Sequence, residues 1–288
     1  MSEIRHSILS AILATPPLPE SLRGLMALAD RPDDPTAALD LFSREPRLPG
    51  QVLALVETHH FGASEGEREL AQAASRMGIP RLASLALVAY ATPRIGQALP
   101  GYRLQPGKLL DHALCSALAA DCLADRLGLK RPTYAFACGF LANIGKTLLD
   151  QALAIHGDDI LGLACSRLCT FDRAEETLLG IDHSEAGALL LEHWEVPNAL
   201  AEVIHWHLHP DEHTGNDATL DLVHMGDALA KLTGVGLGID GMYYQPSVYV
   251  AERLRLTPEI VDTVMAEAMD RRIRLMPLFA AIARAALS

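Results

Sequence analysis

Helical spacing of apolar residues runs through this sequence from its first third to its last. Leucine, alanine and valine recur every three or four residues, as they do on the buried face of an α-helix. Examples are the set Leu22, Leu25, Met26 and Ala29, the set Leu109, Leu110, Ala113, Leu114 and Ala117, and the set Leu222, Val223 and Ala230, with Asp227 at the same spacing. Convincing alternation of apolar and polar residues is absent, and β-branched residues are scarce. The sequence therefore predicts an all-α protein.

Prolines and glycines suggest how the helices are grouped. The stretch Thr92–Gly107 has three prolines, three glycines and weak periodicity, so it is the best candidate for a boundary. We expect an N-terminal subdomain of short helices at residues 1–105 and a larger helical domain with a C-terminal helical extension at residues 106–288. Gly234–Ser247 is a second irregular stretch, and its length indicates a functional loop or an interaction surface.

Charge and hydropathy exclude several classes of protein. There are 24 Lys and Arg against 36 Asp and Glu, for a formal charge of -12, which argues against direct binding of nucleic acid. The longest apolar run, Leu82–Ala91, has about half of the roughly 20 residues that a bilayer requires, so we expect no membrane partner. Ile8–Ala14 has the spacing of a docking helix rather than a signal peptide. The five cysteines include no CxxC pair; we expect reduced core thiols and a cytoplasmic protein.

Histidines and acids recur in a particular order in the second half of the chain. In that order they are His112, Ala142-Asn143-Ile144-Gly145-Lys146, Asp182-His183-Ser184-Glu185-Ala186-Gly187, His207 and His224-Met225-Gly226-Asp227. This order resembles the HD superfamily of metal-dependent phosphohydrolases and, more specifically, the HDOD signalling domains. Three earlier stretches are also similar to that narrower family: Pro17-Leu18-Pro19-Glu20, His60-Phe61-Gly62 and Met77-Gly78-Ile79. The resemblance covers roughly Pro16 to Gly236 and implies an HD-like fold for the larger domain.

The resemblance also implies where a metal would bind. HD enzymes hold a divalent ion with a first histidine, a His-Asp doublet and a distant aspartate, which suits a metal that activates water. Carried over by position, these ligands fall on His112, Ala142-Asn143 and Asp227. Ala142 has no donor atom and Asn143 has only a neutral amide. Half of the shell is missing, as is usual for HDOD domains, so we expect no metal, no other cofactor and no catalytic residue.

The polar residues that remain are expected to line a vestigial pocket able to bind a small ligand. They are His112, Asn143, Lys146, His183, His207, His224 and Asp227. We expect Asp227 to be a buried, hydrogen-bonded carboxylate or a partner of His112. His183 is expected at a helix N-terminus, with Asp182 as its cap. Lys146 either contacts an anion or is a solvated helix residue.

A further histidine cluster precedes Pro210. The spacing of His205 and His209 places them on one helical face. The preferred interpretation is a helix C-terminus, where imidazoles favour the dipole, and adventitious metal binding is the less favoured alternative. Trp194 and Trp206 are expected to be core anchors.

Two functions remain open at this point. The favoured hypothesis is a non-catalytic bacterial signal-transduction module of the response-regulator output type, acting through protein–protein contact or a small ligand. HDOD domains often occur beside receiver, diguanylate cyclase or phosphodiesterase domains, which are therefore the expected partners. The alternative is a residual metal-dependent phosphohydrolase acting on a nucleotide or a cyclic dinucleotide. The sequence does not indicate an oligomeric state.

Overall fold

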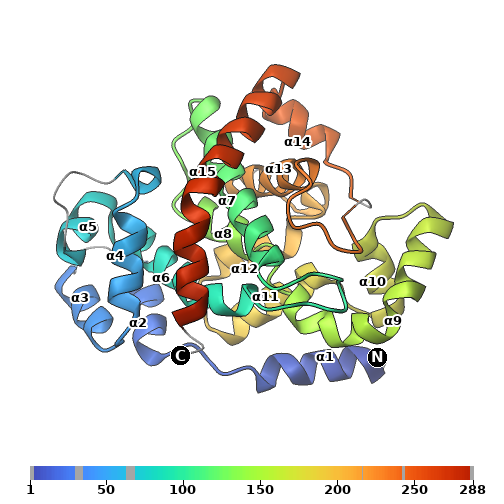
Figure 1. The fold of residues 1–288 in the computed structure, drawn as a ribbon, viewed down its shortest axis with the longest axis horizontal. Coiled ribbons are helices and arrows are strands. Elements are labelled where there is room, and N and C mark those ends of the chain that lie inside the picture. Colours follow the sequence, from blue (N-terminus) through green and yellow to red (C-terminus); the bar gives the residue numbers. More distant parts are fainter. Residues whose placement is uncertain (1–2, 30–34, 63–68, 216, 242–243, 286–288) are drawn as a thin grey trace.

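The described residues of the computed structural model, 3–29, 35–62, 69–215, 217–241 and 244–285, are built from helices (Figure 1). They include no β-strand, and their only strand-like pairing is an isolated bridge between Leu99 and Leu104. The predicted all-α fold class is therefore confirmed. In this part of the chain, no helix is both long enough and apolar enough to span a bilayer.

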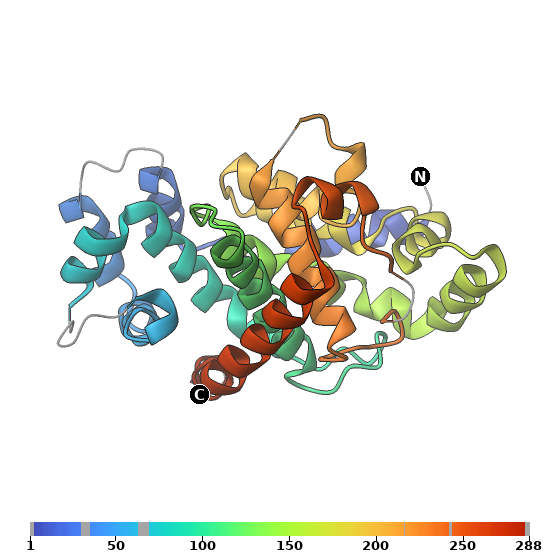
Figure 2. The ribbon, with the colours of Figure 1, turned by 90° about the horizontal axis from the view of Figure 1, so that it is seen from above.

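A lobe of short helices lies at one end of the molecule (Figures 1 and 2). It consists of α2 (Glu20–Ala29), α3 (Pro35–Ser43), α4 (Leu48–Val56), α5 (Leu70–Met77) and α6 (Ile79–Ile95), with the 3-10 turn η1 (His59–Phe61) after α4. Pro49 and Pro80 lie in the first turns of α4 and α6, where the missing N–H leaves no hydrogen bond unmade.

The expected irregular stretch Thr92–Gly107 starts later than predicted. Pro93 lies inside α6, which continues to Ile95 and ends at Gly96. Because α6 is buried between the lobe helices and α8 and α15, packing outweighs the single backbone hydrogen bond that a proline removes. The bridge between Leu99 and Leu104 then organises part of the segment that follows.

The first helix, α1 (Glu3–Ala14), packs against α9 and α11 of the larger part of the molecule. Ile8 and Ile12 are its buried residues, and Arg5 forms an ion pair with Glu185 of α11 at 2.5 Å. The predicted docking helix is confirmed. The domain boundary at residue 105 stays a prediction, although α1 contacts helices on the other side of it.

The larger part is organised around α7 (Lys108–Arg126). This helix packs against α8 (Ala135–Leu141), α13 (Ala218–Leu232) and the long α15 (Pro258–Ala285), and α15 also reaches α6 and α4. Gly226 allows α13 to approach closely, because a Cβ there would lie 2.7 Å from the carbonyl oxygen of Ser116 on α7. This close packing brings the side chains of α7 and α13 together.

The remaining helices surround this centre. They are α9 (Lys146–Arg167), α10 (Phe171–Leu179), α11 (His183–His193), α12 (Asn198–Trp206), the 3-10 turn η2 (Pro210–Glu212) and α14 (Val248–Arg253). Trp194 is buried, as expected, and its indole N–H donates to the carbonyl oxygen of Pro16 at 3.1 Å. Trp206 is only partly buried. The prediction of core thiols was wrong for two cysteines. Cys165, in the last turn of α9, is exposed, and Cys169, just after that helix, is half-buried.

Candidate functional site

Three of the predicted site residues meet beside the first turns of α7. Nε2 of His112 lies 2.9 Å from Oδ1 of Asp227 on α13, and the amide of Asn143 donates to the same oxygen at 2.8 Å. Asn143 lies in the turn between α8 and α9. All three side chains are buried. The predicted pairing of His112 with Asp227 is confirmed.

A lysine that the sequence prediction missed completes this cluster. Lys231 follows Asp227 by one turn of α13, and its ammonium group is an ion-pair partner of Oδ2 of Asp227. Burial alone would raise the pKa of Asp227, but the Lys231 charge and the His112 hydrogen bond outweigh it and hold the pKa well below its usual range. An aspartate four residues before a lysine on one helix is a recognised pairing, so the sequence did contain a signal for Lys231.

The donor set around Asp227 does not fit a divalent metal ion. Its Oδ1 accepts from His112 and Asn143, and its Oδ2 accepts from Lys231. Ala142 supplies only a methyl group, and the Lys231 ammonium would repel a second cation. In the part of the chain that the structure describes, no group of three or more His, Cys, Asp or Glu side chains is placed to hold a metal.

His183 belongs to a second buried cluster, next to the first. It opens α11, and Asp182 caps the helix by accepting from the backbone N–H of Glu185 at 2.8 Å, as predicted. Nδ1 of His183 lies 2.7 Å from Oε2 of Glu175. The other oxygen of Glu175 accepts from the hydroxyl of Tyr102 at 2.6 Å. Glu175 and Tyr102 lie outside the motifs, so the sequence did not indicate them.

The Ile-Gly-Lys turn fits tightly against α11. A Cβ at Gly145 would lie 1.9 Å from the carbonyl oxygen of His183, so only glycine is accommodated there. Asn143 and Lys146 flank this Ile144-Gly145 contact in the sequence, so the contact holds both residues close to the start of α11.

Lys146 is buried, so the expectation of a solvated helix residue was wrong. Its ammonium group donates to Oδ2 of Asp240 at 2.6 Å, and it lies 5.5 Å from the ring centroid of Tyr102. Burial raises the pKa of Asp240, but the charge of Lys146 outweighs this effect and lowers the pKa to about 2. The anion that Lys146 contacts is therefore a side chain of the Gly234–Ser247 loop.

That loop covers the site. Its Val235 carbonyl oxygen lies 3.1 Å from Nδ1 of His112, and the ring of Tyr244 lies 3.6 Å from the Lys231 ammonium. Its Met242 and Tyr243 lie outside the described residues. A cavity of about 420 Å³ beside the loop is lined by Asp227, Lys231 and Tyr244, among others, and is the mouth of the site.

His224 holds the end of this loop. Its Nδ1 donates to the carbonyl oxygen of His207 at 2.7 Å, and its Nε2 accepts from the backbone N–H of Ser247 at 2.8 Å. Both nitrogens are used by a neutral ring, and burial lowers the pKa of His224. His224 is therefore a positioning residue between α12, α13 and the loop.

Four buried polar atoms around the site have no hydrogen-bond partner among the described residues. They are Oδ1 of Asn143, Nε2 of His183, Nε2 of His207 and the hydroxyl of Tyr244. The ring of His183 lies 6.2 Å from that of His207 and 6.1 Å from that of Tyr244, centroid to centroid. An unpaired buried polar atom typically costs about 1–3 kcal/mol. Three of these side chains, His183, His207 and Tyr244, are therefore close neighbours whose buried polar atoms are left unpaired.

The His205 and His209 pair does not form. Helix α12 ends at Trp206, so His209 has left the helical face that carries His205. Nε2 of His209 lies 2.5 Å from Oδ2 of Asp172, whereas the ring of His205 packs edge-on against Trp206 at 4.6 Å. The prediction of a shared face was wrong because the helix ends one turn before Pro210.

The buried imidazole of His207 makes the stability of the fold depend on pH. Burial lowers its pKa from 6.5 to about 3, so the folded protein keeps it neutral while the unfolded chain takes up a proton below about pH 6.5. The free energy of unfolding should therefore fall as the pH falls below that value, by about 1.4 kcal/mol per pH unit for this one group. Urea denaturation between about pH 6 and pH 4.5, compared with His207→Gln, measures the difference. Parallel curves for the two proteins would contradict the assignment.

Comparison with sequences identifies a family. The model of the HDOD domain matches residues 15–210. An uncharacterized protein of Treponema pallidum is 24% identical over 208 residues, which are 72% of this chain and 40% of that protein. This chain thus corresponds to less than half the length of that relative.

Comparison with solved structures gives the same fold. An HDOD domain protein of unknown function from Geobacter sulfurreducens superposes with a TM-score of 0.66 at 18% identity, covering 97% of this chain and 96% of that one. A Marinobacter aquaeolei protein named for signal transduction gives 0.64 at 23% identity, covering 97% and 65%. A Shewanella amazonensis protein named as a phosphohydrolase gives 0.59 at 23% identity, covering 92% and 99%. Since the family model matches more than half of its residues, this chain belongs to the HDOD domain family.

Proposed function

We propose that this HDOD chain is a non-catalytic regulatory module of signal transduction, which acts by binding a protein partner or a small ligand at its HD-type centre. The observation that carries the proposal is the Lys231–Asp227 ion pair. The Lys231 ammonium neutralises Asp227, the one acidic metal ligand of the HD pattern that this sequence keeps. Ala142 and Asn143 provide no other carboxylate. The Lys231 ammonium therefore stands beside Asp227 where an HD enzyme would hold an exchangeable metal ion.

Membership of the HDOD family and the name of the Marinobacter protein support a regulatory role in general. Large apolar side chains near the mouth of the site support contact with a protein. Leu232, Val248 and Tyr249 are all more than 60% exposed, and they flank the two ends of the Gly234–Ser247 loop. Receiver, diguanylate cyclase or phosphodiesterase domains are the partners that we propose, in the cytoplasm of a bacterium.

The second candidate function is a residual phosphohydrolase acting on a nucleotide or a cyclic dinucleotide. It is favoured by the unpaired Nε2 atoms of His183 and His207, which are metal-ligand types of atom, and by the name of the Shewanella protein. The Lys231 ammonium argues against it, because it competes with any metal for Asp227.

Metal analysis and turnover separate the two candidates. We expect the purified protein to contain far less than one equivalent of iron, manganese or zinc, and to show no hydrolysis of a generic phosphodiester above that of an Asp227→Ala variant. One equivalent of metal together with turnover that Asp227→Ala abolishes would establish the phosphohydrolase instead. A rise in melting temperature with a cyclic dinucleotide and without turnover would indicate ligand sensing.

A further inference from the structure

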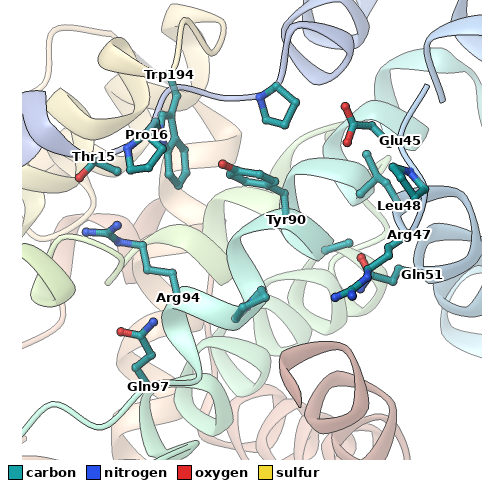
Figure 3. A pocket seen from close by; sticks show the side chains of 14 residues that line it. Thr15, Pro16, Glu45, Arg47, Leu48, Gln51, Tyr90, Arg94, Gln97 and Trp194 are labelled. Atoms are coloured by element: carbon teal, nitrogen blue, oxygen red, sulfur yellow. The ribbon is translucent and has the colours of Figure 1, made fainter. Parts of the chain in front are cut away.

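A separate cavity of about 570 Å³ lies where the lobe of short helices meets the larger part of the molecule (Figure 3). Its walls come from the segment between α1 and α2, from the start of α4, from the second half of α6 and from Trp194 after α11. None of its lining residues belongs to the HD-type centre. Its volume lies within the range of small-molecule sites, roughly 300–1,000 Å³.

The middle of this cavity is apolar and aromatic. The rings of Tyr90 and Trp194 meet edge to face with centroids 5.6 Å apart, and Figure 3 shows Tyr90 extending between Trp194 and the α4 side of the cavity. Pro16, Pro19 and Pro93 add three apolar rings to the lining. The indole N–H is already bonded to the carbonyl oxygen of Pro16, so this wall presents the apolar ring rather than a free donor. Such surfaces suit a flat ring.

One end of the cavity has a cation without a counter-charge. Arg94 is half-buried, and its Nε donates to Oγ1 of Thr147 at 2.7 Å. No acidic side chain pairs with Arg94 within the described ranges, and burial lowers its pKa. Gln97 lies beside it, whereas Glu45 lies beyond Tyr90 on the opposite side of the cavity (Figure 3). A desolvated guanidinium group of this kind gains from an anion.

We propose that this cavity binds a small organic anion that carries a ring, with its anionic group on Arg94 and its ring against Tyr90 and the prolines. A carboxylate and a phosphate present the same hydrogen-bonding chemistry to a guanidinium group. Because the walls come from both the lobe and the larger part, an occupant would join the two. The proposal does not depend on the function of the HD-type centre.

The aromatic anion anilinonaphthalene sulfonate is the probe, and Trp194, which lines the cavity, reports binding in its neighbourhood. The chain has two tryptophans, so in a Trp206→Phe background Trp194 is the only one, and binding in this cavity should quench its emission by energy transfer to the probe. Replacing Arg94 with glutamine in that background should weaken binding about tenfold. Arg94→Lys, which keeps the charge, should retain most of the affinity. Arg126→Gln is the control, because Arg126 is an exposed arginine on α7 that does not line the cavity.

Several results would overturn the proposal. They are unchanged affinity in Arg94→Gln, equal losses in the Gln and Lys variants, equally tight binding of the uncharged phenylnaphthylamine, and bound probe that leaves Trp194 emission unchanged. Displacement of the probe then distinguishes the two head groups. Displacement by indole acetate indicates a carboxylate and displacement by adenosine monophosphate a phosphate, whereas failure of both would also reject the proposal.

Discussion

Replacing Asp227 with asparagine is expected to lower the free energy of unfolding by about 3–5 kcal/mol. Asp227 is buried and accepts hydrogen bonds from His112, Asn143 and Lys231. Asparagine has nearly the same shape but no charge, so the Lys231 ammonium, on a side chain only 8% exposed, loses its partner. Breaking a buried ion pair on one side is costly because it leaves an uncompensated charge. Urea denaturation at neutral pH measures the loss.

The matched control for this variant is an aspartate in an exposed ion pair. Asp158 on α9 pairs with Arg103 at 2.6 Å, and its side chain is 85% exposed, so Asp158→Asn should cost less than about 1 kcal/mol. By itself, Lys231→Met should also destabilise the protein. The double variant Asp227→Asn/Lys231→Met should lose less free energy of unfolding than the two single variants added together, because both charges of the pair are then removed. Equal effects of Asp227→Asn and Asp158→Asn, or simple additivity with Lys231→Met, would show that the buried pair is not what stabilises this centre.

Much of the fold could be predicted from the sequence because its helices are amphipathic. The spacing of apolar residues depends on local geometry alone, and it indicated the helices that bury one face. Helix ends were less predictable. Pro93 predicts a break, but the packing of α6 against α8 and α15 keeps the helix intact to Ile95, and such long-range contacts leave no local pattern.

The candidate site also contains residues that the sequence predicted and residues that it did not. His112 and Asp227 could be paired in advance because their positions match a family pattern. The partners Glu175, Asp240 and Tyr244 could not, because they come from α10 and from an irregular loop whose path is set only by tertiary contacts. Lys146 shows the consequence: its neighbours along the chain suggested a solvated residue, whereas Asp240, 94 residues further on, holds it in the interior.

Introducing a His-Asp doublet at Ala142-Asn143 is expected to create a metal site only when Lys231 is also removed. The variant Ala142→His/Asn143→Asp supplies the two absent ligands, but the Lys231 ammonium still occupies Oδ2 of Asp227 and repels a divalent ion. Adding Lys231→Ala frees that oxygen and leaves His112, the new doublet and Asp227 as an HD-type ligand set. We expect the triple variant to bind Mn²⁺ at least about tenfold more tightly than the double variant, as measured by isothermal titration calorimetry.

The control for this experiment is the triple variant with Asp227→Asn, which keeps the new doublet but lacks the distant carboxylate. Its affinity for Mn²⁺ should fall back toward that of the double variant, because a neutral amide is a poor ligand for a divalent ion. If the double variant binds as tightly as the triple one, then Lys231 is a bystander and the lost doublet alone explains the absence of a metal shell. If only the triple variant binds, then both the Ala142-Asn143 pair and the Lys231 ammonium prevent metal binding at this centre. The ammonium group does so because its ion pair with Asp227 on α13 places a positive charge of the protein itself beside the carboxylate.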